Sequence, residues 1–503
     1  MNVHKPKPDG STVRRLIKPL RRRLDRARRA CPSKEDAADM RASLFTIPFA
    51  FSVIAAPAMA AQTSSPATPG GKEALAILKE AIEVPTVAGR GQVPVLAEKL
   101  KARLLAGGFA ESDIRFTPVG ETGYLTARYA GRDPKARPYV IIGHMDVVEA
   151  KPEDWERDPF KAIVEGGYVF GRGSLDNKGD VSMIVAALAE LKRAGWVPSR
   201  DIILGLSGDE ETQMTTTRAM SEALANAALV LNGDSGGGEL TSEGRPFVYQ
   251  VQAGEKTYAD YVLKVTDPGG HSSRPGAANA IAGMSAALEK IWAYKFPVQL
   301  SPLTKAYLQG SAPHAPAEVA PAMRAFAADP ADAAAAATLS ARPEYVGVIR
   351  TTCVPTMVDG GHAPNALPQS VTANVNCRIF PGTTRAQVKA KLEEIIADPK
   401  IKVTFRDNGT LESIESPLQK DVMSAIDKAV HQRAPGVAIV PAMSAGATDS
   451  MHFRSKGIPA FGVSATFIRS EDDFAHGLNE RLPLATLDAG VKQWETMLRE
   501  LAK

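Results

Sequence analysis

The sequence contains few cysteines, with three among its 503 residues. Cys31 lies before the most apolar stretch of the chain, and Cys353 and Cys377 lie far beyond it. We predict that these two later cysteines are small buried side chains in neighbouring strands. A disulfide between them is the open alternative, because an exported protein permits one and two is an even number.

Long hydrophobic runs are also scarce, since residues 44–61 are the only strongly apolar stretch. This stretch contains Pro48 and Pro57 and ends in small residues around Ala60. An apolar core followed by small residues is typical of a signal peptide, here cleaved near Ala60. A membrane anchor is the alternative, but the run is short for a membrane span and carries two prolines.

The signal-peptide interpretation also assigns the segments before and after this apolar run. A charged region normally directly precedes the apolar core, so we expect translation to start at Met40 and the signal peptide to cover residues 40–61. Residues 1–39 would then be a non-native or disordered extension, and residues 62–72 a linker rich in Pro, Ser and Thr. The sequence therefore predicts a periplasmic or secreted protein without a stable membrane anchor after cleavage.

The main body of the chain has no excess of basic residues. Residues 1–40 contain 12 Lys+Arg and 5 Asp+Glu, so the totals of 60 and 56 leave 48 basic and 51 acidic residues for 41–503. A nucleic-acid-binding body would need a basic face, and this balance argues against nucleic acid as a partner.

Three sequence patterns are missing from the chain. There is no internal repeat, no Lys-Ser/Thr phosphate-loop spacing and no His-Glu-x-x-His sequence. The last absence excludes the single-zinc proteases that bind their metal through two histidines on one helix.

Residues 73–254 show an alternation of predicted helices and strands. Short apolar strands that alternate with helices indicate an α/β fold, with a mainly parallel sheet covered by helices on both faces. Such sheets place their sites at the carboxyl ends of the strands. The predicted strands cover 140–142, 202–206 and 228–231, and the predicted helices cover 73–83, 93–107 and 181–193.

Residues 255–414 have a different pattern, typical of a smaller α+β domain with an antiparallel sheet. Within it, residues 298–345 are rich in Ala and Pro and predict a helical insertion. The first pattern returns over 415–503, so we expect one catalytic domain interrupted by this inserted lid domain. The elements predicted after residue 254 are strands at 257–265, 346–352, 370–380, 401–405 and 460–463, and helices at 279–294, 384–396, 418–431 and 484–501.

Acidic residues and a histidine follow the predicted strands. His144 and Asp146 come directly after strand 140–142, and being two apart on an extended segment they share a face. Glu210 and Glu211 follow strand 202–206, and Asp234 follows the next strand. Adjacent acids in a cleft would repel each other, and a bound metal ion removes that cost.

Two further residues complete a candidate metal site. Asp176 lies in a Gly-rich loop that opens helix 181–193, where a carboxylate can offer both oxygens to two cations. His476 lies near the chain end in Ala-His-Gly-Leu-Asn-Glu. Nitrogen and oxygen donors suit zinc, with Mn²⁺ or Co²⁺ as substitutes.

The motifs GHMDVV, GRGSLDNKGD, GDEET, NGD, GGHSSRP and AHGLNER occur in this order over residues 73–503. This set strongly resembles the di-zinc metallopeptidase family of glutamate carboxypeptidases, carboxypeptidase S, aminoacylases and succinyl-diaminopimelate desuccinylase. The resemblance implies a zinc-exopeptidase-like catalytic domain that carries a lid domain.

The resemblance also implies a role for each residue of the site. Two Zn²⁺ ions would be held, with a metal-bridging hydroxide between them as the nucleophile. The peptide bond after Asp176 would be cis. The implied roles are His144 and Asp234 on one metal, Glu211 and His476 on the other, Asp176 as the bridge, Asp146 orienting His144, and Glu210 as general base.

Four lid and loop residues match substrate-handling positions of the family. The resemblance implies that His271 stabilises the developing oxyanion, often in a neighbouring subunit's site, so a homodimer is an open alternative. Asn365 and Arg378 would grip the substrate, and Gly446 would line the pocket. Because Arg378 can hold a carboxylate through two hydrogen bonds, we expect a substrate with a free carboxylate next to the scissile amide.

Three functions are compatible with these residues. The first is a zinc carboxypeptidase or dipeptidase acting on small peptides, and the second is an aminoacylase-like hydrolase of N-acyl amino acids. The third is a catalytically inactive peptide-binding homologue, which the presence of all five ligands and of Glu210 argues against.

Overall fold

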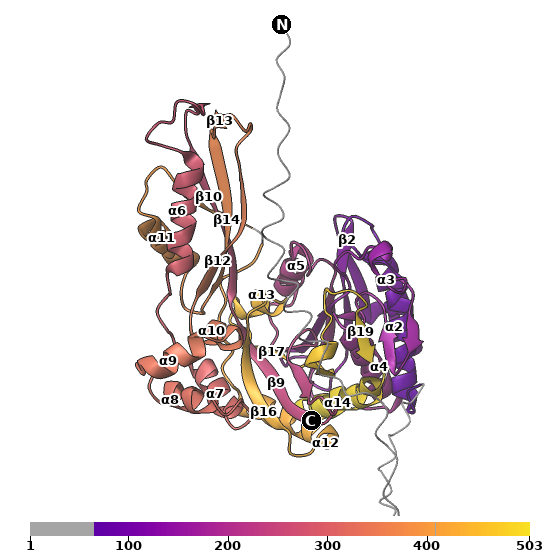
Figure 1. Ribbon diagram of the computed structural model, residues 1–503. Helices are drawn as coiled ribbons and strands as arrows, with labels where there is room; N and C mark the ends of the chain where they lie inside the picture. The colour runs from indigo at the N-terminus through magenta and orange to yellow at the C-terminus, as the bar shows by residue number, and fades with distance from the viewer. Residues whose placement is uncertain (1–64, 408) are drawn as a thin grey trace, which may run out of the picture. The chain divides into compact units, whose positions relative to one another are not determined.

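The structure is a computed structural model that describes residues 65–407 and 409–503 (Figure 1). These described residues form one compact unit. The predictions for residues 1–39 and 40–61, including the signal peptide, lie outside the described residues. In the described part of the chain, no helix is long and apolar enough to cross a membrane.

The largest element of this unit is a ten-stranded sheet. Its centre is parallel, because β3 pairs in parallel with β6 and β7, and β7 with β17, while the pairs at the β1 edge are antiparallel. This arrangement confirms the predicted α/β class with a mainly parallel sheet. In spatial order the strands are β1 (Ile114–Val119), β2 (Thr122–Tyr129), β6 (Ile202–Ser207), β3 (Tyr139–His144), β7 (Leu229–Asn232), β17 (Ala460–Gly462), β9 (Pro246–Glu255), β8 (Gly237–Leu240) and β18 (Phe467–Arg469), and β16 (Ala438–Ser444) also pairs with β9.

Helices cover both faces of this sheet, and the alternation of side chains in β3 shows how. Ile141 belongs to the main core, whereas Val140 and Ile142 belong to a second core on the opposite face. A strand buried on both faces reads as a continuous apolar run. The main core includes α2 (Pro69–Ile82), α3 (Val93–Ala106), α4 (Lys178–Arg193), α12 (Lys420–Arg433) and α14 (Ala485–Leu501), and the second includes α5 (Thr215–Ala223) and α13 (Ser450–Arg454).

The helix α2 starts earlier than the sequence predicts, so the expected linker over 62–72 is wrong for its last residues. The Thr68 hydroxyl accepts a hydrogen bond from Gly71 N and caps the helix. Asp488 of α14 accepts hydrogen bonds from the Thr68 backbone and side chain. Pro69 at the first helical position is also favourable there.

A small ribbon joins two distant parts of the chain that carry predicted ligands. β5 (Tyr168–Phe170) pairs with β4 (Ile163–Glu165) and with β19 (Arg481–Pro483). This pairing places the segment after His476 beside the start of the Gly-rich loop. Short 3-10 helices occur at Glu111–Asp113, Pro152–Asp154 and Ser470–Asp472.

The lid sheet is antiparallel throughout, in the order β12 (Thr352–Gly360), β14 (Ser370–Ile379), β10 (Thr257–Thr266), β15 (Lys402–Arg406). Helices α6 (Ala280–Ala293) and α11 (Arg385–Ile396) pack on it and share its core (Figure 1). A two-stranded ribbon, β11 (Gly270–His271) with β13 (Ala366–Leu367), lies at one end of the lid sheet (Figure 1).

Four helices with a core of their own occupy the region of the expected insertion: α7 (Pro302–Ser311), α8 (Ala320–Ala328), α9 (Ala333–Ser340) and α10 (Pro343–Ile349). The expected strand at 346–352 is wrong, because most of it is the end of α10 and β12 begins only at Thr352. The apolar, β-branched run suggested a strand. Its residue Ile349 is instead buried in the helical core, so tertiary packing decides the conformation.

The cysteines of the lid correct the first expectation. Cys353 of β12 lies directly opposite Cys377 of β14, and the two form a disulfide. The predicted neighbouring strands are found, but the predicted free thiols are wrong.

Removal of this disulfide is expected to destabilise the lid. The bond closes a loop with a sequence separation of 24. A Cys353→Ala/Cys377→Ala protein should therefore lose about 2–4 kcal/mol of unfolding free energy, which urea denaturation measures. Zinc binding should not change, because the candidate ligands lie outside the lid. An unaltered urea midpoint would show that the bond contributes nothing to stability.

Candidate metal centre

Three of the strand ends meet as the sequence predicts. His144 is the last residue of β3, Glu210 and Glu211 follow β6, and Asp234 follows β7. Because β3 pairs in parallel with both β6 and β7, these carboxyl ends lie at the same edge of the sheet.

The first candidate ligand group is His144, Asp176 and Asp234. His144 Nε2 lies 2.9 Å from Asp176 Oδ1 and 3.4 Å from Asp234 Oδ1. The His144 side chain is 1% exposed, so its ring is fixed within the protein.

The second candidate ligand group is Asp176, Glu211 and His476. His476 Nε2 lies 2.9 Å from Glu211 Oε1 and 3.2 Å from Asp176 Oδ2. Asp176 thus turns one carboxylate oxygen to each group, which is the arrangement of a bridging ligand. The Asp176–Asn177 peptide bond is cis.

The crowded carboxylates of the two ligand groups create negative charge that cations would balance. Burial and the charges of Asp176 and Asp449 raise the pKa of Asp234 to about 7. Hydrogen bonds to Asp176 and Glu211 raise the pKa of His476 to about 10. Such crowding of carboxylates is unfavourable without positive charge, and bound metal ions supply it.

The donor set therefore fits two metal ions, one in each group, with Asp176 shared. Every candidate donor is an imidazole nitrogen or a carboxylate oxygen, as zinc, cobalt and manganese sites use. Two such ions, when bound, would polarise an oxygen of a substrate and lower the pKa of water. Side chains of this chain would position the ligands and transfer the protons around these ions.

Asp146 occupies the predicted place but makes different contacts from those expected. His144 Nδ1 lies 3.0 Å from the main-chain oxygen of Asp146 and 3.6 Å from its carboxylate. The carboxylate instead accepts hydrogen bonds from Glu210 N at 3.1 Å and Glu211 N at 3.0 Å. Asp146 therefore holds His144 through its carbonyl and both glutamates through its side chain.

Glu210 is the candidate proton carrier. It is buried and belongs to neither ligand group. Burial, with the charges of Asp234, Asp449 and Glu211, raises the pKa of its carboxyl. A raised pKa suits a group that takes a proton from water and passes it to the leaving nitrogen.

Glu480 is an important residue to which the sequence assigned no role. It is fully buried, and its carboxylate accepts hydrogen bonds from Gly173 N, Leu175 N and Asp176 N at 2.8–3.0 Å. It also forms an ion pair of 2.7 Å with Arg172. Glu480 therefore fixes the loop that carries Asp176, and its place four residues after His476 in a recognised motif was the available signal.

Asp449 is a second residue without an assigned role. Its buried carboxylate accepts hydrogen bonds from Ser207 Oγ and Thr217 Oγ1, at the end of β6 and in α5. Burial raises its pKa to about 7. Its charge acts on both Glu210 and Asp234, so it shapes the field at the site without being a ligand.

The structure divides the predicted substrate residues into two pairs. His271 and Asn365 come together on the lid ribbon, where His271 pairs with Ala366 and Ser272 N donates to Asn365 O. In the described structure, neither residue belongs to a candidate ligand group. Neither lines the cavity next to these groups, which is described below.

Arg378 and Gly446 lie beside each other near that cavity. Arg378 donates a hydrogen bond of 2.7 Å to Ala445 O, and Ala445 lines the cavity. The Arg378 guanidinium also lies over the Tyr258 ring. Gly446 N donates to Ser444 Oγ in the same loop.

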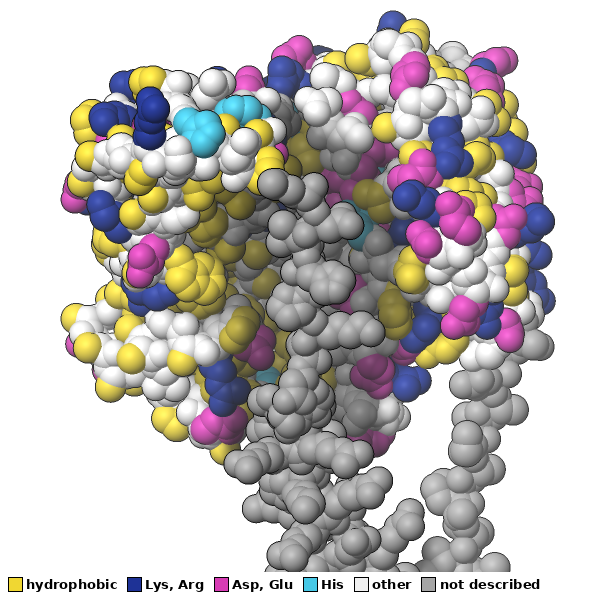
Figure 2. Space-filling model, turned by 45° about the horizontal axis from the view of Figure 1, so that its top comes forward, with side chains coloured by type: hydrophobic (Ala, Val, Ile, Leu, Met, Phe, Trp, Pro, Cys, Tyr) yellow, Lys and Arg dark blue, Asp and Glu magenta, His cyan; other side chains and the backbone are white. Residues whose placement is uncertain are grey.

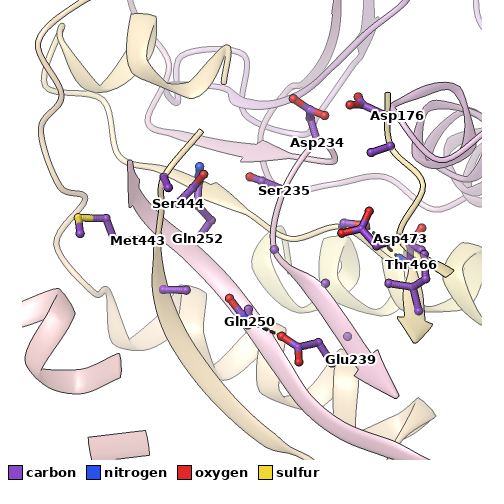
Figure 3. A pocket seen from close by; sticks show the side chains of 18 of the residues that line it. Asp176, Asp234, Ser235, Glu239, Gln250, Gln252, Met443, Ser444, Thr466 and Asp473 are labelled. Carbon is purple, nitrogen blue, oxygen red and sulfur yellow. Dashed lines mark hydrogen bonds between the residues drawn. The ribbon is translucent and has the colours of Figure 1, made fainter. Parts of the chain in front are cut away.

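A cavity of about 570 Å³ opens beside the candidate metal ligands. Asp176 and Asp234 lie at one end, and Gln250 and Glu239 lie at the other (Figure 3). Residues of α7 and α10, among them Tyr307 and Glu344, complete the wall. The helical insertion therefore contributes directly to the binding space.

The surface around the site carries charges of both signs. Figure 2 shows acidic side chains and a histidine inside the hollowed part of this face, while Lys, Arg, Asp and Glu are mixed over its outer surface. These acidic side chains agree with a site for cations, while hydrophobic side chains line another part of the hollow (Figure 2).

Comparison with known proteins gives three findings. The model of the peptidase family M20/M25/M40 matches residues 140–500. The human protein described as N-fatty-acyl-amino acid synthase/hydrolase PM20D1 is 28% identical over 433 residues, which cover 82% of this chain and 85% of that protein. Solved structures with the same fold include two members of the family M20.

The first of these structures is the metallo-carboxypeptidase Sso-CP2 from Sulfolobus solfataricus. It aligns with a TM-score of 0.68 at 18% identity, over 86% of this chain and 99% of that one. The second is the YXEP protein from Bacillus subtilis, described as a dinuclear metal binding peptidase. It aligns with a TM-score of 0.54 at 13% identity, over 86% of this chain and 98% of that one.

Proposed function

The chain belongs to the peptidase family M20/M25/M40 and is a hydrolytic metalloenzyme, and from this premise we propose that it is a di-zinc hydrolase of an amide bond next to a free carboxylate. The observation that carries the proposal is the position of Asp176, whose two oxygens face His144 and His476 separately. A shared carboxylate between two ligand groups supports a two-metal site.

The chain's own residues divide the work. His144, Asp176, Glu211, Asp234 and His476 would hold the zinc ions. Glu210 would take a proton from the attacking water and deliver it to the leaving nitrogen. Arg378 would bind the substrate carboxylate, since its guanidinium forms no ion pair among the described residues.

Two substrate classes are proposed, with the same chemistry. The first is small peptides, cleaved by a carboxypeptidase or dipeptidase action, and the metallo-carboxypeptidase fold supports it. The second is N-acyl amino acids, which the human relative's name supports. Apolar residues in the cavity wall, Val348, Met443 and Ile468, give an acyl chain a surface to contact.

We also propose that the protein works outside the cytoplasm. The Cys353–Cys377 disulfide supports this location, because disulfides persist in oxidising compartments. The predicted leader over residues 40–61 agrees with it.

The test compares substrates that share one leaving amino acid. Metal-replete protein should release leucine from glycyl-leucine, N-acetyl-leucine or N-dodecanoyl-leucine, and the ranking of kcat/KM would separate the two substrate classes. Chelation should abolish turnover, and zinc, or cobalt or manganese, should restore it. Absence of turnover with all three substrates, in protein with metal shown to be bound, would refute the proposed function.

A further inference from the structure

Lys256 is a buried cation on the wall of the cavity. It follows β9 and precedes β10, where the chain passes from the large sheet into the lid. Its side chain is among the largest that are fully buried, and the residue lines the cavity beside the metal ligands. Its Nζ donates one hydrogen bond of 2.6 Å to Arg350 O.

This ammonium group has no anionic partner in the part of the chain that the structure describes. No carboxylate of the described residues lies within 4.0 Å of it, and this includes Glu239 and Glu344, which also line the cavity. Glu239 is engaged by Gln250 Nε2. Burial and the charge of Arg378 lower the pKa of Lys256 to about 7. A buried charge without a partner is costly, so an anion in the cavity would be stabilised there.

Arg378 is a second cation at the same place. Lys256 N donates a hydrogen bond to Ser444 O, and Arg378 Nη1 donates to Ala445 O. The main chain of Lys256 therefore lies against the same short segment as the Arg378 guanidinium, and the Lys256 ammonium, bonded to Arg350 O, is close enough for the charge of Arg378 to act on it. No ion pair of Arg378 is found among the described residues either. Burial lowers the pKa of Arg378, and Asp260, whose charge opposes this shift, is engaged by Asn374 and Asn376.

An uncommitted amide completes this wall. Gln252 is 2% exposed, and its Oε1 is fixed by a hydrogen bond of 2.7 Å from Arg454. Its Nε2 has no hydrogen-bond partner among the residues that the structure describes. Gln252 lies beside Ser444, across from Asp234 (Figure 3). The wall near the metal ligands thus presents donors whose acceptors are missing.

We infer that Lys256 acts with Arg378 to bind a carboxylate of the substrate, with Gln252 Nε2 as a neutral donor on the same wall. The inference rests on the proposed function, because it assumes a substrate that carries a free carboxylate. That carboxylate belongs either to the backbone of the leaving amino acid or to its side chain, and both present the same chemistry to the two cations.

The experiment removes the charge of Lys256 in two ways. Lys256→Gln keeps a donor for Arg350 O but loses the charge, and Lys256→Met loses both. Lys264→Gln, on the exposed face of β10, is the matched control. The substrates are N-acetyl-leucine and its amide, and N-acetyl-glutamate and N-acetyl-glutamine. Steady-state kinetics measure turnover. Calorimetry measures binding of the same four compounds to zinc-loaded protein that also carries Glu210→Gln and therefore does not consume them.

Loss of one charge-assisted interaction should raise KM or Kd of N-acetyl-leucine about 10- to 100-fold in Lys256→Gln protein. The values for its amide should change less than about threefold, and the Lys264→Gln protein should behave as wild type. A selective loss for N-acetyl-glutamate over N-acetyl-glutamine would assign the carboxylate to the side chain instead.

Equal losses for acids and amides in Lys256→Gln protein would overturn the inference and leave Lys256 as a tie to Arg350. Unchanged values for all four substrates would overturn it as well. If Lys256→Met protein does not fold, the glutamine variant still decides between these outcomes. Failure of the proposed function is a separate result: wild-type protein would then neither turn over nor bind any of the four, and the inference would fall with it.

Discussion

Replacement of Glu210 by glutamine is expected to lower kcat by about 10²- to 10⁴-fold, the usual contribution of a positioned general base. Glutamine keeps the shape of the side chain, and the hydrogen bond from Glu210 N to Asp146 does not depend on the side chain. The metal content should stay the same, because Glu210 belongs to neither ligand group. Steady-state kinetics and metal analysis on the same preparation measure the two effects.

The control for this variant is Glu222→Gln, an exposed glutamate of α5 that forms no ion pair in the described structure. It should retain wild-type kcat and metal content. If Glu210→Gln protein keeps activity within about tenfold of wild type, the general base lies elsewhere. If it loses metal instead, Glu210 is a ligand and the division between Glu210 and Glu211 is wrong.

Replacement of Glu480 by alanine is expected to have the largest structural effect. It would leave Arg172 buried without its charge partner and three backbone N–H groups without an acceptor. Breaking a buried ion pair in this way costs about 3–5 kcal/mol of unfolding free energy. Because these N–H groups belong to the loop of Asp176, zinc binding and activity should fall together with stability.

Chemical denaturation, zinc titration and turnover separate these consequences. Glu471→Ala, an exposed residue in the same part of the chain, is the control and should change each of them little. Glu480→Gln is the milder variant, because its amide oxygen can still accept hydrogen bonds from the loop. Only its amide nitrogen would face N–H donors that it cannot bind. A Glu480→Ala protein with normal zinc affinity would show that the loop holds Asp176 without this carboxylate.

The fixed backbone of the loop also bears on His476. His476 has a φ of 61°, in the left-handed region that non-glycine residues seldom adopt. Arg172 Nη2 donates to His476 O at 3.4 Å, and Glu480 pairs with the same arginine. One buried ion pair therefore connects the chain segments of Asp176 and His476, two of the three members of the second ligand group.

The sequence by itself predicted most of the candidate metal centre. Apolar strands followed directly by His144, Glu211 and Asp234 placed these residues at one sheet edge, because the carboxyl ends of parallel strands coincide. Asp176 and His476 lie in loops with no such rule, and only the ordered motifs identified them. The predicted disposition of all five residues agrees with the two ligand groups of the structure.

Tertiary structure alone decided the contacts around these ligands. The Asp146 carboxylate binds the backbone of Glu210 and Glu211, and Glu480 binds the loop of Asp176, through chain segments far apart in sequence. Local periodicity carries no information on such partners. The same holds for Lys256, because its burial and its lack of an ion-pair partner within the described structure depend on how β9, α10 and β14 pack together.

Packing also decided two of the points at which sequence patterns misled. Residues 346–349 have the composition of a strand but end a helix, because Ile349 is buried in the core of the insertion. Cys353 and Cys377 read as separate thiols until the register of β12 and β14 placed them opposite each other. Residue types and their order indicated which chemistry this protein can perform. Strand register and long-range packing decided which other residues position the side chains of the candidate site.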